Sequence, residues 1–228
     1  MTRLNEVLLT QVLLPRPVFT TRDVVELTGF SLSVTSRHLG SLARRGVLTR
    51  VTRGVWAQPR HHEFSPYAAV PFLLRATDRK RSREAYGYIS LLSALSLRGV
   101  ISQIPRAISV VTSKRLPTLH TPVGSYEFHR LEPTLIGGFE PYGQGRNFDV
   151  ATAEKALFDT LYFSVRRGRR FAHLPEIEVP RTFRPREVEL WINRIVYVRL
   201  RSAVARRWRA LREHLLQNSV TERLGHTA

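Results

Sequence analysis

The chain of 228 residues contains no cysteine. Disulfides, thiolate zinc sites, iron–sulfur clusters and a cysteine nucleophile are therefore excluded. The longest stretch without a charged residue, 85–97, has 13 residues, whereas a membrane-spanning helix needs about 20 apolar ones. The first ten residues include Asn5 and Glu6, which do not fit the apolar region of a signal peptide. We therefore expect a cytoplasmic protein that is not inserted in a membrane.

Lysine and acidic residues are scarce as well. Of the 36 basic residues only Lys80, Lys114 and Lys155 are lysines, the others are arginines, and there are 18 acidic residues, so the net charge is +18. Two-metal chemistry would be short of aspartate ligands, because the sequence has only four aspartates. The positive excess indicates a polyanionic partner, either nucleic acid or an acidic membrane surface.

Motifs of enzymes are missing too. The sequence has no phosphate-binding loop ending in Gly-Lys, no Gly-x-Ser-x-Gly and no His-Glu-x-x-His. Glu154 directly precedes Lys155, whereas one common nuclease motif places its acid two residues before the lysine. The run His61-His62-Glu63 could hold a metal ion, but no further ligand is recognisable near it. We expect no catalytic residue, no cofactor and no metal, and hence not an enzyme.

The first 57 residues have the element order of a winged helix-turn-helix. A first helix is expected over 4–12, and Thr20 and Gly29 mark the beginning and end of a second. Ser31 begins a third helix, which ends at Gly46. Its predicted inward stripe consists of Leu32, Thr35, Leu39 and Leu42. Residues 47–51 and 55–57 flank a Thr-Arg-Gly turn, which predicts a β-hairpin, the wing.

The rest of the chain is predicted to be a larger mixed α+β domain over 67–217. A polar linker over 58–66 precedes it, and the tail, 218–228, is expected to fray. Helices are expected over 86–97, 152–165, 186–195 and 198–217, and strands over 107–112, 124–131, 135–140 and 146–150.

The outward face of the third helix is the predicted DNA-reading surface. Its candidate contact residues are Ser33, Val34, Ser36, Arg37 and Ser41, joined by Arg50 and Arg53 on the hairpin. Arginine can pair with guanine through two hydrogen bonds in the major groove, and small hydroxylated side chains suit phosphates and base edges. The alternative is a winged helix that serves as a protein-interaction module.

The last helix carries many arginines without an intervening acidic residue. These are Arg199, Arg201, Arg206, Arg207, Arg209 and Arg212. Three interpretations stay open: a docked helix with a solvated charged face, a second contact to DNA, and a helix on a membrane surface.

Several longer runs together resemble the AbiEi-type antitoxins of bacterial type IV, or abortive-infection, toxin–antitoxin systems. The resemblance covers residues 17–165, through FTTRDVVELTGFSLSVTSRHLGSLARRGVLTRVTRGVWA, AYGYISLLSALSLRGVISQIPRAISVVTSKR, TPVGSYEFHRL and ATAEKALFDTLYF. The helix-turn-helix part is unspecific. Its combination with SLLSALSLRGV, Gln103-Ile104-Pro105 and Glu154-Lys155-Ala156-Leu157 is more selective.

The resemblance implies an antitoxin that also represses transcription of its own operon. Family members bind inverted repeats of double-stranded operator DNA and counter a nucleotidyltransferase-like toxin, directly or indirectly. The recognition helix would contribute Ser33, Val34, Ser36 and Arg37, and the wing Arg50 and Arg53. We expect a monomer or weak dimer that binds cooperatively to DNA. The alternative is a plain winged-helix regulator whose C-terminal domain dimerises or senses a ligand.

Overall fold

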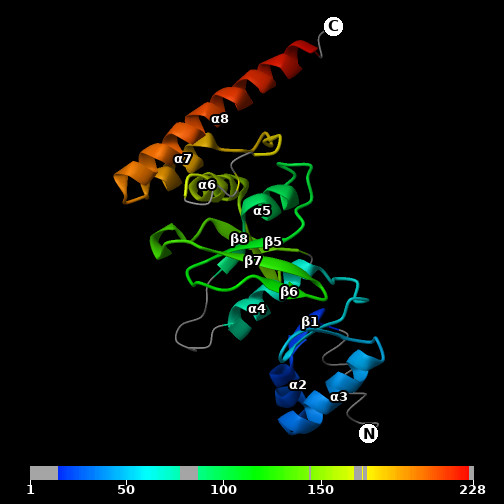
Figure 1. Cartoon of the computed structure of the whole chain (residues 1–228). Helices are drawn as coiled ribbons and strands as arrows, with labels where there is room; N and C mark the ends of the chain where they lie inside the picture. The colour runs from blue at the N-terminus through cyan, green and yellow to red at the C-terminus, as the bar shows by residue number, and fades with distance from the viewer. Residues whose placement is uncertain (1–14, 78–86, 144, 167–170, 172–173, 226–228) are drawn as a thin grey trace.

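The computed structural model of the chain describes the backbone of residues 15–77, 87–143, 145–166, 171 and 174–225, with side chains as far as residue 215 except that of 214. The expected first helix over 4–12 lies outside these ranges. The fold is mixed α+β and has a three-stranded and a six-stranded sheet. Figure 1 shows the helices and sheets stacked along one long axis, with α2 and α3 at one end and α8 at the other.

The N-terminal unit consists of two helices and the three-stranded sheet. Its elements are β1 (Val18–Thr20), α2 (Thr21–Thr28), α3 (Leu32–Arg44), β2 (Thr49–Thr52) and β3 (Val55–Ala57). Both helices and the hairpin β2–β3 lie where the sequence predicts them. Strand β1 was not expected. It pairs antiparallel with β3, opposite β2, so that β3 is the central strand.

Local capping fixes the ends of α2 and α3. The Thr20 hydroxyl accepts a hydrogen bond from the N–H of Asp23 at 3.1 Å, and the Asp23 carboxylate accepts one from the N–H of Thr20 at 2.7 Å. Gly29, with φ of 70°, ends α2, and Ser31 caps α3 by accepting from the N–H of Val34 at 3.4 Å. Gly46, with φ of 71°, turns the chain into the hairpin. These caps hold the corner between α2 and α3.

A small core holds α3 against the rest of this unit. Phe19, Val24, Leu39, Leu48 and Trp56 are buried together, and Thr35 is buried as expected. Leu32 is 58% exposed, so its predicted place in the inward stripe is wrong. Its position explains the difference: as the first residue of α3, it extends past the packed layer and lines a groove beside the hairpin.

The remaining chain forms the six-stranded sheet and its helices. The elements are η2 (Pro66–Ala69), α4 (Val70–Thr77), β4 (Gly87–Ile89), α5 (Leu91–Leu97), β5 (Ile108–Thr112), β6 (Leu119–Thr121), β7 (Gly124–Arg130), η3 (Pro133–Leu135), β8 (Phe139–Tyr142), β9 (Phe148–Ala151), α6 (Ala153–Ser164), α7 (Pro185–Asn193) and α8 (Val198–Gly225). The strand order is β6-β7-β5-β4-β9-β8. The pairs β5–β7 and β4–β9 are parallel and the others antiparallel.

Two expectations for this part are wrong in detail, and a third element is longer than predicted. The helix predicted over 86–97 is α5, which begins only at Leu91 because Gly87–Ile89 form the strand β4. Gly87 lies so close to the neighbouring strand that a Cβ atom on it would be 2.9 Å from the Val111 carbonyl oxygen. The strand predicted over 135–140 is displaced to β8, because η3 and the positive-φ residues Gly137 and Gly138 precede it. The helix predicted over 198–217 continues as α8 to Gly225, since no glycine or proline stops it earlier.

The two units are joined by packing. In Figure 1, α4 lies between the N-terminal unit and the large sheet, whereas α5 and α6 lie on the opposite face, with α7 and α8 beyond them. Val18, Val51 and Val55 of the small sheet belong to the same hydrophobic core as Leu73 of α4. The N–H of Gln58 donates to the Pro17 carbonyl at 2.8 Å, which extends the pairing of β1 with β3 by one residue. The polar stretch after β3 therefore runs along a shared core rather than between two separate ones.

Candidate nucleic-acid interface

The outward face of α3 is small, polar and open to solvent. Ser33, Val34, Ser36 and Arg37 are exposed, and Ser41 is half-buried. A Cβ atom on Gly40 would meet nothing within 4 Å, so the surface beside it is unobstructed. Among the described residues, Arg37 has no hydrogen bond or ion pair through its guanidinium. Its donors are therefore available to a ligand.

The hairpin presents two further arginines beside α3. The Arg50 guanidinium carbon lies 5.8 Å from the centre of the Trp56 ring, and Trp56 donates to the Thr21 hydroxyl at 2.9 Å. This contact orients Arg50 on the ring while its N–H donors stay accessible. Arg53 is exposed at the turn, next to Gly54 with φ of 77°.

A groove of about 780 Å³ runs between α3, the start of α2, the hairpin and α4. Ser36, Arg50 and Arg53 line it, whereas the other predicted residues, Ser33, Val34, Arg37 and Ser41, lie outside its lining, on the neighbouring face of α3. The structure thus places all seven predicted residues on α3 or the hairpin.

Sequence reasoning missed part of this groove. Arg22, Leu32 and Arg75 also line it, together with Asp23 and Glu26. Arg75 could not have been found, because it lies on α4, a helix that the sequence analysis did not predict. The four arginines outnumber the two carboxylates, and Asp23 is already engaged at the cap of α2. The groove therefore carries a positive excess.

His38, the one histidine of α3, does not add to this charge at neutral pH. It is half-buried. Burial, and secondarily the positive charge of Arg45, lowers the pKa of the His38 imidazole. The positive charge that α3 offers to a phosphate backbone thus comes from its arginines.

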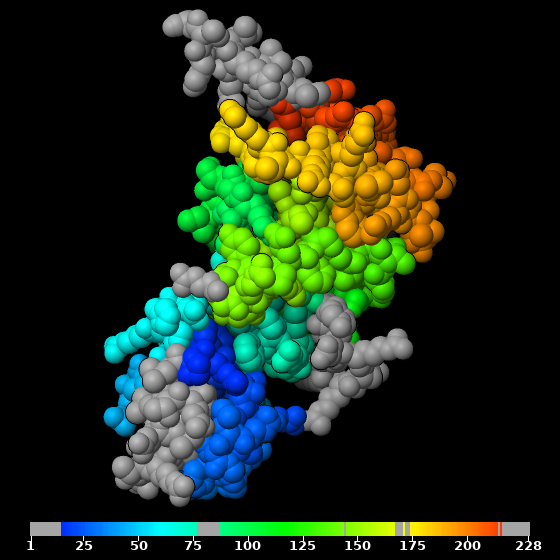
Figure 2. Space-filling model, turned by 180° about the vertical axis from the view of Figure 1, so that it is seen from behind, coloured from blue at the N-terminus to red at the C-terminus, as the bar shows by residue number. Residues whose placement is uncertain are grey.

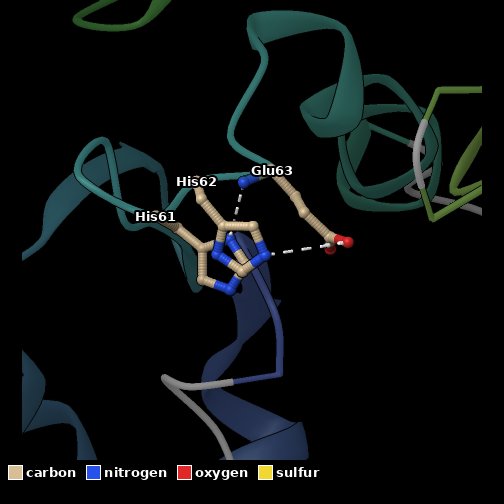
Figure 3. Close-up of side chains that lie close together, drawn as sticks. All are labelled: His61, His62 and Glu63. Atoms are coloured by element: carbon tan, nitrogen blue, oxygen red, sulfur yellow. Dashed lines mark hydrogen bonds and ion pairs between the residues drawn. The ribbon is translucent and has the colours of Figure 1, made fainter.

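Figure 3 shows the candidate metal ligands His61, His62 and Glu63. The two imidazole rings are stacked, with centres 4.5 Å apart and planes 20° from parallel. Nδ1 of His61 accepts from the N–H of Glu63 at 3.1 Å, and His62 Nε2 lies 4.0 Å from the Glu63 carboxylate. The lone pair of an imidazole nitrogen lies in the plane of its ring. Two stacked, nearly parallel rings therefore cannot both direct a lone pair at one ion about 2.0–2.1 Å away. In this arrangement the three residues do not form a metal centre.

Of the three selective motifs of the second unit, two serve mainly the core, whereas Gln103 and Ile104 of the third are exposed. Arg98 donates to the carbonyl oxygens of Ala151 and Val150 at 3.1 and 3.2 Å, and pairs with Glu140 at 2.7 Å. Lys155 and Asp159, one turn apart on α6, form a fully buried ion pair. These contacts position strands and helices and offer no reactive group to a substrate.

The buried ion pair has an unusual environment. Asp159 also accepts from the Tyr88 hydroxyl at 3.1 Å and the Ser90 hydroxyl at 2.7 Å. The Lys155 ammonium lies 4.6 Å from the centre of the Trp191 ring and 4.8 Å from that of Phe158. Burial raises the pKa of Asp159 and lowers that of Lys155, while the contact between the two groups opposes both shifts.

The long helix α8 is docked at the end of the molecule that lies away from α3 (Figures 1 and 2). Val204 and Trp208 are buried in the core. Arg201 and Arg207 donate to the carbonyl oxygens of Ile195 and Phe171, and Arg212 pairs with Glu189 at 2.9 Å. The docked interpretation thus accounts for three of the six arginines between Arg199 and Arg212. Within the described part of the chain, no helix is long and apolar enough to cross a membrane.

Comparisons with known proteins give little beyond this geometry. No protein-family model and no curated protein matches the chain. Among solved structures, the crystal structure of the Rv2827c protein from Mycobacterium tuberculosis is similar, with 18% sequence identity and a TM-score of 0.44. The match covers 70% of this chain and 59% of that protein, which is less than two thirds of its length. A similarity at this level assigns the chain to no family and to no function.

Proposed function

We propose that this chain is a DNA-binding transcriptional repressor whose N-terminal unit is a winged helix-turn-helix. In this proposal α3 enters the major groove and the hairpin β2–β3 is the wing. The observation that carries it is the open face of α3, on which Arg37 is unpaired among the described residues, beside Arg50 and Arg53. A major groove about 12 Å wide admits such a helix.

The residues of this surface have different roles in the proposal. Arg37 pairs with a guanine through two hydrogen bonds, and Val34 packs on a thymine methyl group. Ser33, at the N-terminal end of α3, is placed to donate to a phosphate or a base edge. Arg50 and Arg53 bind phosphates and carry no sequence preference. Specificity is therefore assigned to α3, and electrostatic affinity to the hairpin.

The test is titration of the full-length protein against two labelled duplexes by fluorescence anisotropy. One duplex covers the DNA upstream of the gene for this chain, and the other is a scrambled version of equal length and composition. We expect tighter binding to the upstream duplex, in the range of about 10³-fold or more over scrambled DNA at physiological salt. Equal affinity for both duplexes would leave only non-specific binding and would refute the repressor.

Neutralising the hairpin should change the salt dependence of binding without changing its sequence preference. In the double variant Arg50→Gln/Arg53→Gln, the slope of log K against log salt should become less steep by about 1.8, since each lost phosphate contact removes about 0.9. Both duplexes should be affected alike.

Arg199→Gln/Arg206→Gln is the matched control for this measurement. Both arginines are exposed on α8 and lack a hydrogen bond or ion pair among the described residues, and the change in net charge is the same. The slope should stay unchanged in this control. If the slope of log K against log salt became less steep in the control and not in the hairpin variant, the phosphate contacts would belong to α8 rather than to the hairpin.

We further propose, from the sequence resemblance, that the second unit neutralises a nucleotidyltransferase-like toxin, directly or indirectly. The test is co-expression with a nucleotidyltransferase-like protein encoded next to this chain, scoring growth and a promoter reporter in the same cells. Protection from growth arrest supports the antitoxin. Repression without protection favours the alternative, a plain winged-helix regulator.

A further inference from the structure

A second pocket, of about 960 Å³, lies in the layers of the molecule away from α3. It is formed where β7 ends, at the C-terminal end of α6 and at the start of α8. Because β5 and β7 run parallel, with Thr112 opposite Arg130, both strands end at the same edge. Arg130 and Arg115, which follows β5, are thereby brought to one rim.

Three guanidinium groups surround the pocket. Arg115, Arg130 and Arg166 are exposed, and none of them forms an ion pair with a carboxylate in the part of the chain that the structure describes. Guanidinium groups hold phosphates by paired hydrogen bonds in a fixed, forked geometry. The pocket therefore offers the donors that a phosphate group or groups would need.

The walls of the pocket are aromatic. Phe128, Phe163, Phe171 and Tyr197 line it, and Tyr197 is 65% exposed, so that its ring is free to stack. Planar bases stack on such rings, and a combination of arginines with aromatic rings is typical of sites that bind nucleotides or single strands. The volume lies within the range of about 300–1,000 Å³ usual for small-ligand pockets.

One carboxylate, that of Glu132, is present in the lining. It accepts a hydrogen bond from the Tyr162 hydroxyl at 3.5 Å, and the guanidinium of Arg166 lies 5.5 Å from the centre of the same ring. Tyr162 thus spaces Glu132 from Arg166. As an acceptor, the Glu132 carboxylate can take a hydrogen bond from the amino group of a base or from a ribose hydroxyl.

We propose that this pocket binds a phosphorylated nucleoside. The arginines hold its phosphates, an aromatic ring stacks on its base, and Glu132 accepts from its N–H or O–H groups. The ligand is either a free nucleotide or the phosphorylated end of a single strand, which offer the same chemistry. This proposal does not depend on DNA binding by α3, since none of its residues belongs to the N-terminal unit.

The test is isothermal titration calorimetry of the full-length protein with ATP, GTP, CTP and UTP. Inorganic triphosphate and the four nucleosides are the matched partial ligands. A six-nucleotide RNA with and without a 5′-phosphate separates a strand end from a free nucleotide. We expect at least one phosphorylated ligand to bind at least about 10-fold more tightly than inorganic triphosphate or its own nucleoside.

Two variants tie the binding to this pocket. Arg130→Gln and Arg166→Gln should each weaken binding by about 10-fold or more, as expected for the loss of a hydrogen bond to a charged group. Arg206→Gln on α8 is the control and should bind as the wild type does. Both pocket variants should melt at the wild-type temperature and bind operator DNA normally, because both arginines are exposed and lie at the ends of β7 and α6, two elements that Figure 1 shows away from α3.

Three results would overturn the proposal. These are no binding of any phosphorylated ligand at millimolar concentration, equal affinity for inorganic triphosphate, and unchanged binding by both variants. Failure of DNA binding alone would leave the pocket intact, so the two proposals fail separately.

Discussion

Replacing Lys155 by methionine is expected to lower the free energy of unfolding by about 3–5 kcal/mol. The substitution keeps a long unbranched side chain, but among the described residues it leaves the fully buried Asp159 carboxylate with only the Tyr88 and Ser90 hydroxyls as partners. An uncompensated charge in the core is strongly destabilising. Urea unfolding followed by circular dichroism measures the loss.

The loss in Lys155→Met should depend on pH with a defined sign. Burial already raises the pKa of Asp159, and removing the ammonium group raises it further. A carboxyl whose folded pKa lies above its unfolded value of about 3.9 destabilises the fold increasingly as the pH rises through the interval between the two values. The variant should therefore be closer to the wild type at pH 5 than at pH 8.

Two further variants separate this effect from a simple packing defect. Lys155→Met/Asp159→Leu removes both charges and should regain part of the stability, as apolar replacements of buried pairs do. Arg199→Met on the exposed face of α8 should change stability by no more than about 0.5 kcal/mol. A loss below about 1 kcal/mol in Lys155→Met, or a double variant no more stable than the single one, would contradict the assignment.

Replacing Arg37 by alanine is expected to cost about 1–3 kcal/mol of specific DNA binding, which is about 5- to 150-fold in affinity. Affinity for scrambled DNA should change far less, and the fold should stay intact because the side chain is exposed. In cells the variant should derepress the promoter yet still protect against the toxin, since it alters only the DNA face. Anisotropy on both duplexes and the paired growth and reporter assay measure these effects.

The outcomes of Arg37→Ala discriminate between roles. An equal loss on both duplexes would make Arg37 a phosphate contact rather than a base contact. Loss of protection at matched protein level would mean that neutralisation depends on DNA binding, and the proposed separation of the two activities would be wrong. Ser202→Ala, an exposed position on α8, is the control and should change neither readout.

Elements with strong local signals were predictable from the sequence. The capping box of Thr20 and Asp23, the cap at Ser31 and the glycines at 29 and 46 bound α2 and α3 where the pattern places them. The same holds for α6, which Thr152 caps by accepting from the N–H of Lys155 at 3.2 Å. Such signals act within one helical turn, so they need no knowledge of the tertiary structure.

Elements that depend on distant partners were not predictable. Strands β1 and β4 have only three residues each. Strand β1 exists through its pairing with β3, and β4 through its pairing with β5 and β9. Helix α4 contains Pro71, which obscures its pattern, although it lies in the shared core. The i, i+4 spacing of Lys155 and Asp159 is equally common on solvated helix faces, so nothing local marks that pair as buried.

The groove beside α3 likewise combines residues that were predictable from the sequence with residues that were not. Its predicted members, Ser36, Arg50 and Arg53, follow from the helix-turn-helix pattern, whereas Arg75 joins them only because α4 packs on the small sheet. The second pocket depends even more on the tertiary structure, since it combines residues from the end of β7, from α6 and from α8. Pockets made by several elements require the topology and cannot be found from spacing along the chain.

The central claim, that α3 enters the major groove of operator DNA, is tested most directly by mapping where α3 lies on the duplex. The chain has no cysteine, so Ser33→Cys and Ser202→Cys each supply one exposed thiol, on α3 and on α8. Each is coupled to an iron–EDTA chelate that cleaves nearby DNA. The Ser33 conjugate should cut the upstream duplex at two symmetry-related positions within the inverted repeat, and the Ser202 conjugate should not cut there. Cleavage from Ser202 and none from Ser33 would contradict the account, because the DNA would then lie on the opposite end of the molecule.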